Sequence, residues 1–338
     1  MKFLTKQATA AVLAAITTPG LAMAEATVYG KAHLSFGSVS EDDGTTDNSS
    51  TAITSHKSRV GIKGSMDTDG ASILIYKLEW EVDMTDNSKD NTDVNFVDQS
   101  TQTHNHIKAR SQYVGLKANW GEVRIGRDDS PYKIAAKKKV EFLSDTWADW
   151  NNIIDKDQDT RNDDSISYSK QIGPGKLGLM YAAGNDDPAA ENAGAGTSIA
   201  YDADFGNFGV ALATQTIEES STNDVTGTKL VLSYKLGSTQ IGLAYETVED
   251  DLTLDDTNTF LAVKHKLNDT DNLKFAYGTK DQGLANDATM TALAYEHSLS
   301  KDVTLYGLWA SGADDGLNAN AKLAGDSTVL VTGVIAKF

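Results

Sequence analysis

The side chains that could support catalysis or bind a metal are few in this chain of 338 residues. It contains no cysteine, so thiol nucleophiles, disulfides and cysteine-based zinc sites are absent. His104 and His106 lie two residues apart in a polar stretch, but two histidines without further ligands do not make a zinc site. The acid-rich run 155–164 lacks the glycine and the closing glutamate of an EF-hand. Neither a Ser-His-Asp signature nor a phosphate loop is present, and the sequence predicts no enzyme.

Charged side chains recur instead within segments in which apolar and polar residues alternate. Leu273, Phe275 and Tyr277 fall on one face of such a segment, and Lys274 falls on the other. A β-strand projects successive side chains to opposite faces, so each segment has one apolar and one polar face. The charges in the middle of the polar faces are Lys77, Glu79, Lys117, Arg124, Glu246, Lys264 and Lys274.

The alternation predicts sixteen antiparallel strands in one domain, residues 25–338. Short turns rich in glycine, asparagine and aspartate, such as 119–121 and 173–175, alternate with long acidic loops such as 37–51 and 311–327. No change of composition divides the chain. The predicted strands are 26–37, 55–67, 71–84, 105–118, 121–128, 161–171, 176–183, 196–205, 207–217, 227–236, 239–248, 257–267, 272–280, 288–299, 302–311 and 326–338.

Residues 1–24 have the features of a secretory signal peptide. Lys2 and Lys6 precede a short apolar run at 7–18, and Ala22-Met23-Ala24 forms a cleavage site. Removal of the two lysines changes the net charge of −18 to −20, which disfavours nucleic acid as a partner. The remainder has no apolar run long enough for a membrane helix.

Alternation alone does not decide whether the apolar face is buried in a soluble sandwich or faces lipid. Aromatic residues near strand ends favour lipid, because amphipathic rings suit a membrane–water boundary. A final strand that pairs with the first would close the sheet and leave no edge unpaired in hydrocarbon. Sixteen closed strands enclose a water-filled channel. The aromatic residues concerned are Tyr181, Tyr201, Phe205, Tyr245 and Tyr295.

Four segments in order resemble the general diffusion porins of Gram-negative outer membranes. They are ATVYGKAHLSFG (26–37), SRVGIKG (58–64), YVGLKANWGEVRIGR (113–127) and VIAKF (334–338). The resemblance implies an all-β, 16-stranded antiparallel transmembrane barrel that assembles as a homotrimer in the outer membrane. It also implies that the third loop, about 128–160, folds into the pore and narrows it.

The resemblance further implies opposed charges at the constriction. Basic residues on the wall would be Lys31, Arg59, Arg110 and Arg161, and acidic residues on the loop would be Glu141 and Asp145. Parity from Leu116 points Arg110 outward, so a β-bulge is needed to turn it inward. The cations Lys137, Lys138 and Lys139 depart from the family pattern and leave the sign of ion selectivity open. Arg127 is expected at the subunit interface.

The implied function is passive diffusion of ions and small hydrophilic solutes, without a cofactor. One alternative is a channel of the same fold that selects sugars, oligosaccharides or anions, although Trp147 and Trp150 are only a fragment of an aromatic path. A remote alternative is a secreted soluble β-sandwich that acts as a binding protein or glycosidase. The expected partners are outer-membrane lipid and lipopolysaccharide, with divalent cations bridging lipopolysaccharide and the acidic loops.

Overall fold

The computed structural model describes residues 25–42, 47–85, 107–135, 137–155, 157–184, 195–220, 223–250, 255–281, 287–314 and 326–338. The predicted signal peptide, residues 1–24, lies outside the described residues, as do His104 and His106.

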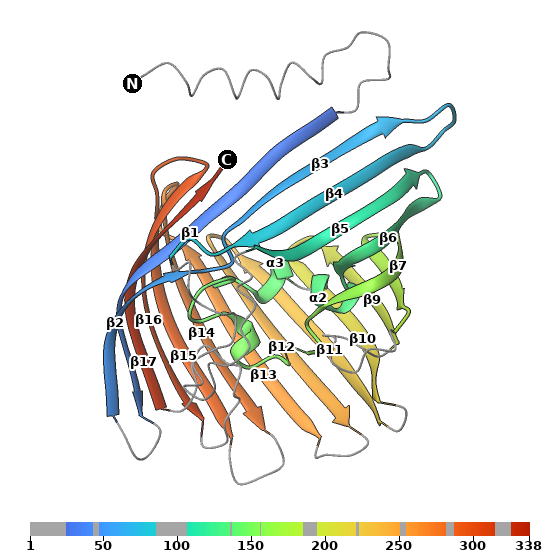
Figure 1. Ribbon diagram of the computed structural model, residues 1–338. Helices are drawn as coiled ribbons and strands as arrows, with labels where there is room; N and C mark the ends of the chain where they lie inside the picture. The colour runs from blue at the N-terminus through green and yellow to red at the C-terminus, as the bar shows by residue number, and fades with distance from the viewer. Residues whose placement is uncertain are drawn as a thin grey trace, which may run out of the picture.

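The strands form one antiparallel sheet that closes on itself (Figure 1). β17 pairs with β1 along twelve residues, from Lys31 opposite Lys337 to Asp42 opposite Asp326. β2 and β3 both pair with β1 and make one interrupted strand of the wall, so the 17 segments form a sixteen-stranded barrel. The strands are β1 (Glu25–Asp42), β2 (Asp47–Ser55), β3 (Arg59–Asp67), β4 (Ile73–Val82), β5 (Ile107–Ala118), β6 (Gly121–Asp129), β7 (Arg161–Ile172), β8 (Gly175–Ala182), β9 (Gly196–Phe205), β10 (Phe208–Ser220), β11 (Asn223–Leu236), β12 (Thr239–Asp250), β13 (Asp256–Lys266), β14 (Asp271–Asp281), β15 (Ala288–Ser298), β16 (Val303–Asp314) and β17 (Asp326–Lys337).

This topology confirms the predicted barrel and excludes the two-sheet sandwich. The prediction of a long loop at 37–51 is wrong, because β1 and β2 continue as a paired hairpin to Asp42 and Asp47. Polar residues cover both faces of that hairpin, so the sequence pattern lacked the apolar signal of a strand. The predicted second strand is interrupted at residues 56–58, where Lys57 has a φ of 50°.

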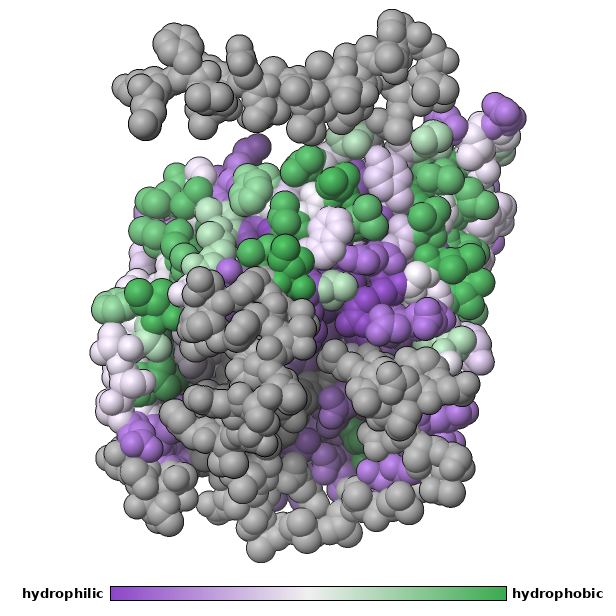
Figure 2. All heavy atoms as spheres, viewed as in Figure 1, coloured by the Kyte–Doolittle hydropathy of each residue, from purple (hydrophilic) through white to green (hydrophobic). Residues whose placement is uncertain are grey.

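The two faces of the wall differ as the alternation predicts. On β14, Tyr277 is exposed on the outer face, whereas Ala276 and Lys280 are buried on the inner face. Hydrophobic side chains gather on the outer face of the wall in Figure 2, over β3–β5, where Ile62 and Val114 are exposed. The outer face is therefore apolar and the inner face polar.

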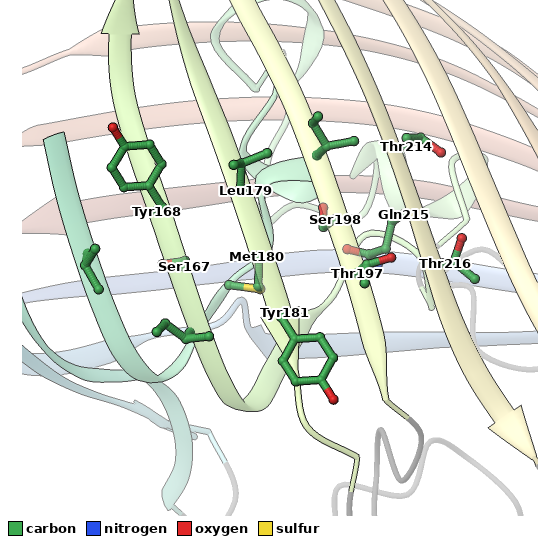
Figure 3. Close-up of a pocket in the computed structure, with 13 residues that line it drawn as sticks. Ser167, Tyr168, Leu179, Met180, Tyr181, Thr197, Ser198, Thr214, Gln215 and Thr216 are labelled. Atoms are coloured by element: carbon green, nitrogen blue, oxygen red, sulfur yellow. The ribbon is translucent and has the colours of Figure 1, made fainter. Parts of the chain in front are cut away.

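A hollow of about 470 Å³ lies over β6–β10 of the wall (Figure 3). Tyr181 and Ile199 at this hollow are exposed on the outer face, while Gln215 and Ser198 are buried on the inner face. The hollow thus opens to the outside of the barrel and is not part of the interior.

Between β6 and β7 the chain enters the barrel interior and forms α2 (Pro131–Ile134), α3 (Lys137–Val140) and the short 3₁₀ helix η1 (Trp150–Asn152). We call residues 130–160 the inner loop. Ser130 starts α2, because its hydroxyl accepts a hydrogen bond from the Lys133 amide. Among the described residues, none of the helices is long and apolar enough to cross a membrane.

Candidate functional site

The tip of the inner loop contacts the wall through Asp145. Lys31 Nζ on β1 lies 2.5 Å from Asp145 Oδ2, and Arg59 Nη1 on β3 lies 3.3 Å from the same oxygen. Lys57, at the interruption between β2 and β3, lies 3.7 Å from Asp145 Oδ1. Burial alone would raise the pKa of the Asp145 carboxyl, but the three cations hold it well below its usual range. Two of the predicted wall cations, Lys31 and Arg59, therefore lie against a predicted loop carboxylate.

The backbone at Asp145 is set for this contact. Its φ of 57° is in the left-handed region, which aspartate tolerates better than most residues. The Asp145 amide donates a hydrogen bond to Asp149 Oδ2 at 2.6 Å. Asp149 also caps η1 by accepting from the Asn151 amide. The turn thus aims the Asp145 carboxylate away from the loop and at the wall.

Arg110 is turned inward by an irregularity in the β4–β5 register. Leu78 pairs with Gln112 but Trp80 pairs with Ala109, so two residues of β5 oppose one residue of β4. Arg110 is consequently buried and meets carboxylates of β4 rather than the loop. Its Nε donates to Glu79 Oε1 at 2.8 Å, and its Nη1 donates to Glu81 Oε2 at 2.6 Å. Arg110 is therefore neutralised within the wall.

Arg161 and Arg127 are also paired locally. Arg161 Nε at the start of β7 lies 3.0 Å from Asp129 Oδ1 at the end of β6. Arg127 forms an ion pair with Asp163 on β7, next to a register shift between Gly126 and Asp128. Both arginines are thus paired with carboxylates at the β6–β7 edge of the wall.

The three loop lysines have different environments. Lys139 is buried and pairs with Asp202 and Asp204 on β9. Lys137 lies 3.8 Å from Asp129, whereas Lys138 is exposed and forms no ion pair within the described ranges. The sequence pattern grouped these residues, but the helical turn of α3 points them at separate parts of the interior.

Glu141 differs from Asp145 in having no ion pair among the described residues. Burial, followed by the nearby carboxylate of Asp149, raises the pKa of Glu141 to about 7, although the Lys137 cation opposes the shift. A carboxyl with this pKa changes its charge near neutral pH. Glu141 is therefore a loop group whose charge depends on pH between about 6 and 8.

The base of the inner loop is held by a buried lysine. Lys229 on β11 is 1% exposed, and its Nζ lies 4.1 Å from the ring centre of Tyr132 and 4.5 Å from that of Trp150. Asp159 Oδ1 lies 3.5 Å from the same nitrogen. An ammonium over two aromatic faces and beside a carboxylate is a favourable arrangement for a buried cation. We call these four residues the loop anchor.

A buried carboxylate on β12 adds to this attachment. Glu246 accepts a hydrogen bond from the Tyr132 hydroxyl at 2.6 Å and another from the Asp155 amide at 2.8 Å. Asn258 on β13 donates to Glu246 Oε2 at 2.8 Å. On the next strand, Lys274 Nζ donates to the Phe142 carbonyl at 2.6 Å and pairs with Glu296. The inner loop is thus tied to the wall from β11 to β15 as well as at β1 and β3.

Two cavities flank the inner loop. The tip cavity, about 310 Å³, lies between the loop tip and β1, β3 and β14–β17. The lysine cavity, about 700 Å³, lies between α2, α3 and β6–β12. The charged residues of the tip cavity are Lys31, Arg59, Lys274, Lys337, Asp145 and Glu296. Those of the lysine cavity are Arg124, Lys137, Lys138, Lys139, Lys176, Lys235, Asp128, Asp129, Asp202 and Asp204.

Several charged residues of this site were not predicted as site residues. Glu79 appeared in the sequence only as a charge on a polar strand face, and its pairing with Arg110 depends on the bulge. Lys57 and Asp149 gave no sequence signal, because both act through the turns in which they lie. Trp150 is buried against Lys229, so it does not belong to an aromatic path along the interior.

Comparisons with known proteins agree with this architecture. A family model described as Gram-negative porin matches residues 8–316. No curated protein sequence is similar enough to count as a match. The fold is similar to the anion-selective porin from Comamonas acidovorans, with a TM-score of 0.75 and 21% identity over 93% of this chain and 100% of that one. It is also similar to OmpF of Salmonella typhi, with a TM-score of 0.70 and 14% identity over 93% of this chain and 98% of that one. For OmpT of Vibrio cholerae the TM-score is 0.67, with 17% identity over 96% of this chain and 100% of that one.

A closed sheet with an apolar outer face and a polar interior is a structure that can cross a membrane, since each described strand of the wall, with β2 and β3 counted as one, has two paired neighbours. The family model covers most of the sequence. This chain belongs to the Gram-negative porin family and forms an outer-membrane channel for passive diffusion.

Proposed function

We propose that the inner loop is the constriction of the channel and that it selects solutes by size and charge. The loop anchor and Glu246 support this role, because a loop fixed at both its base and its tip can hold a constant aperture. One side of the narrowest path would be formed by Lys31, Arg59 and Asp145. Glu141 and Lys137 would lie beside this path. Arg110 and Arg161 would act through the wall carboxylates that they neutralise.

We further propose that the channel prefers anions. The tip cavity has four cationic and two anionic side chains, and the lysine cavity has six and four. Ten cations against six carboxylates leave a positive excess in the lining of these two cavities, although the whole chain carries a net charge of −18. Fixed charges that line a pore bias which ions enter it. This positive excess is the observation that supports an anion preference over a cation preference.

The reversal potential in planar bilayers tests the proposal. Purified folded protein is inserted between two KCl solutions of different concentration, and the potential at zero current is recorded. We expect stepwise ohmic openings and a reversal potential displaced toward that of chloride. A displacement toward potassium would refute the anion preference while leaving the channel intact.

The channel is proposed to assemble as a homotrimer, as one of the similar structures, OmpT of Vibrio cholerae, is described as a trimer form. Arg127 would lie near the interface together with Asp163, its ion-pair partner. Exchanging the two charges in the variant R127D/D163R should preserve the trimer if only their mutual pair matters. The trimer is detected by the gel migration of unheated samples and by native mass spectrometry. The single variant R127D should weaken the trimer.

Lipopolysaccharide is the proposed lipid partner on the outer side, with divalent cations between its phosphates and the acidic loops. Glu41, Asp42 and Asp47, where the β1–β2 pairing ends, and the acidic composition of 311–327 support this contact. Removal of divalent ions should lower the thermal stability of the trimer in native outer membrane. Unchanged stability would argue against bridging.

A further inference from the structure

We propose that the lysine cavity is a binding station for multivalent oxyanions, such as pyrophosphate and organic phosphates, on the periplasmic side of the inner loop. The inference deepens the proposed anion preference and rests on it. It adds a place in the channel where one class of anion is retained rather than merely admitted.

Three lysines in this cavity have no carboxylate partner within the described ranges. Lys138 comes from α3, Lys176 from β8 and Lys235 from β11, and all three are exposed to the interior of the cavity. The other lining cations are already paired, for example Arg124 with Asp128 at 2.6 Å. A ligand with several negative charges would therefore meet three lysines that form no ion pair in the described part of the chain.

The inner loop itself produces this arrangement. In the β8–β9 register Lys176 lies opposite Asp202, which would be its natural partner across the strands. Lys139 of the inner loop pairs with Asp202 instead. The inserted loop thus occupies this carboxylate, and Lys176 has no ion pair with any residue that the structure describes.

A second contact holds the backbone at Lys138 in place. Gln240 Nε2 donates a hydrogen bond to the Lys138 carbonyl at 3.0 Å, which ties α3 to β12. Gln240 is the register partner of Lys235, so the same pair of strands positions two of the three lysines. The three ammonium groups are therefore carried by elements that the loop and the wall hold in place.

The size and location of the cavity suit a compact polyanion. A volume of about 700 Å³ is within the usual range for small-molecule sites, roughly 300–1,000 Å³. Ser169 and Ser233 line the cavity and offer hydroxyl groups to phosphate oxygens. Lys176 and Lys235 stand next to the short turns at 173–174 and 237–238. Short turns lie on the periplasmic side of such barrels, which places the cavity there.

Single-channel recording of the full-length folded protein tests the station. Pyrophosphate is added to one side of the bilayer at a time while KCl carries the current, and glucose 6-phosphate is tested in the same way. We expect a saturable block that is stronger from one side. The variant K138Q/K176Q/K235Q should raise the half-blocking concentration by about tenfold or more, since it removes three positive charges that would attract the anion at close range.

The control variant K170Q/K266Q/K301Q removes the same number of charges from exposed positions that do not line the lysine cavity. It should leave the block unchanged. D204N should instead strengthen the block, because Asp204 is a lining carboxylate that is 62% exposed. Heat-dependent gel migration verifies that each variant is folded.

Equal block of the unaltered protein and K138Q/K176Q/K235Q would overturn the station, as would no block by either phosphate. The reversal potential in KCl is measured on the same membranes. A normal chloride preference without phosphate block would refute only the station, whereas a potassium preference would refute the proposed anion selectivity.

Discussion

Lys31 Nζ on β1 and Asp145 Oδ2 on the inner loop lie 2.5 Å apart, although 114 positions separate them in the sequence. Arg59 approaches the same carboxylate oxygen at 3.3 Å. The loop tip is therefore in direct contact with the wall, and several cations share this one carboxylate. Selectivity should depend strongly on this group.

The substitution D145N should make the channel more selective for anions. Asparagine keeps the left-handed backbone at this position and removes only the charge. Lys31, Arg59 and Lys57 would then lack their shared carboxylate. One unit charge at about 4 Å is worth about 1 kcal/mol in water, so the chloride-to-potassium permeability ratio should rise roughly fivefold.

Reversal potentials in a KCl gradient measure this effect. Asp269 provides the matched control, because its side chain is 98% exposed in a short turn. D269N makes the same change of charge away from the inner loop and should leave the ratio as it was. Equal shifts in the two variants would contradict a local role for Asp145.

Selectivity should also depend on pH through Glu141. Burial and the Asp149 carboxylate raise the pKa of Glu141 to about 7, so it is largely ionised at pH 8 and largely neutral at pH 6. Loss of a negative charge at lower pH should shift the reversal potential toward that of chloride, with a midpoint near 7. Lys137, Asp149 and Asp159 are the other charged groups that act on it.

The variant E141Q should abolish that midpoint and behave at pH 8 as the unaltered protein does at pH 6. Stability has a defined sign as well. Because the pKa of Glu141 is raised in the folded protein, its contribution to the free energy of unfolding is present at low pH and lost as the pH rises through about 7. An unaltered midpoint in E141Q would assign the transition to another group.

Removal of the buried cation of the loop anchor should loosen the inner loop. In K229M, the Asp159 carboxylate would stay buried without the ammonium that lies 3.5 Å away. Lys133 Nζ would still lie 3.2 Å from Asp159 Oδ2, so the cost should stay below the roughly 3–5 kcal/mol of a buried charge left without any partner. We expect a lower unfolding temperature and noisier single-channel currents.

Lys63 is a suitable control for K229M, because its ammonium lies 5.0 Å from the ring centre of Tyr29 but is exposed. K63M should change stability by less than about 1 kcal/mol. Heat-dependent gel migration reports unfolding, and bilayer recordings report the noise. Quiet currents in K229M would show that Lys229 is not needed to hold the loop.

The wall at Gly278 should tolerate no larger residue. A Cβ atom there would lie 2.6 Å from Ile153 Cγ1 of the inner loop. G278A should therefore push the loop base from β14, at a cost of roughly 1–3 kcal/mol, and change the single-channel conductance. G307A is the control, since a Cβ at Gly307 meets no heavy atom within 4 Å. Equal conductance in both variants would contradict the close contact.

The site was predictable where it depends on alternation and on short turns. The faces of Tyr277 and Lys274 follow from a period of two, and the closed sheet follows from the requirement that no strand edge stay unpaired in hydrocarbon. The inward turn of Arg110 does not follow, because it requires a bulge whose position depends on the pairing of β4 with β5. The partner of Arg110 was likewise unpredictable, since Glu79 and Glu81 are as acidic in sequence as Asp145.

By itself, the sequence determined the strands, the apolar and polar face of each, and the presence of a long connection between β6 and β7. These properties depend on local periodicity, which each strand carries in its own residues. The tertiary structure alone decided that Asp145 meets Lys31, that Glu141 has no ion pair within the described ranges, and that Lys139 pairs with Asp202, which lies opposite Lys176. Such pairings join residues far apart in the chain, and only the path of the inner loop through the closed barrel brings them within reach.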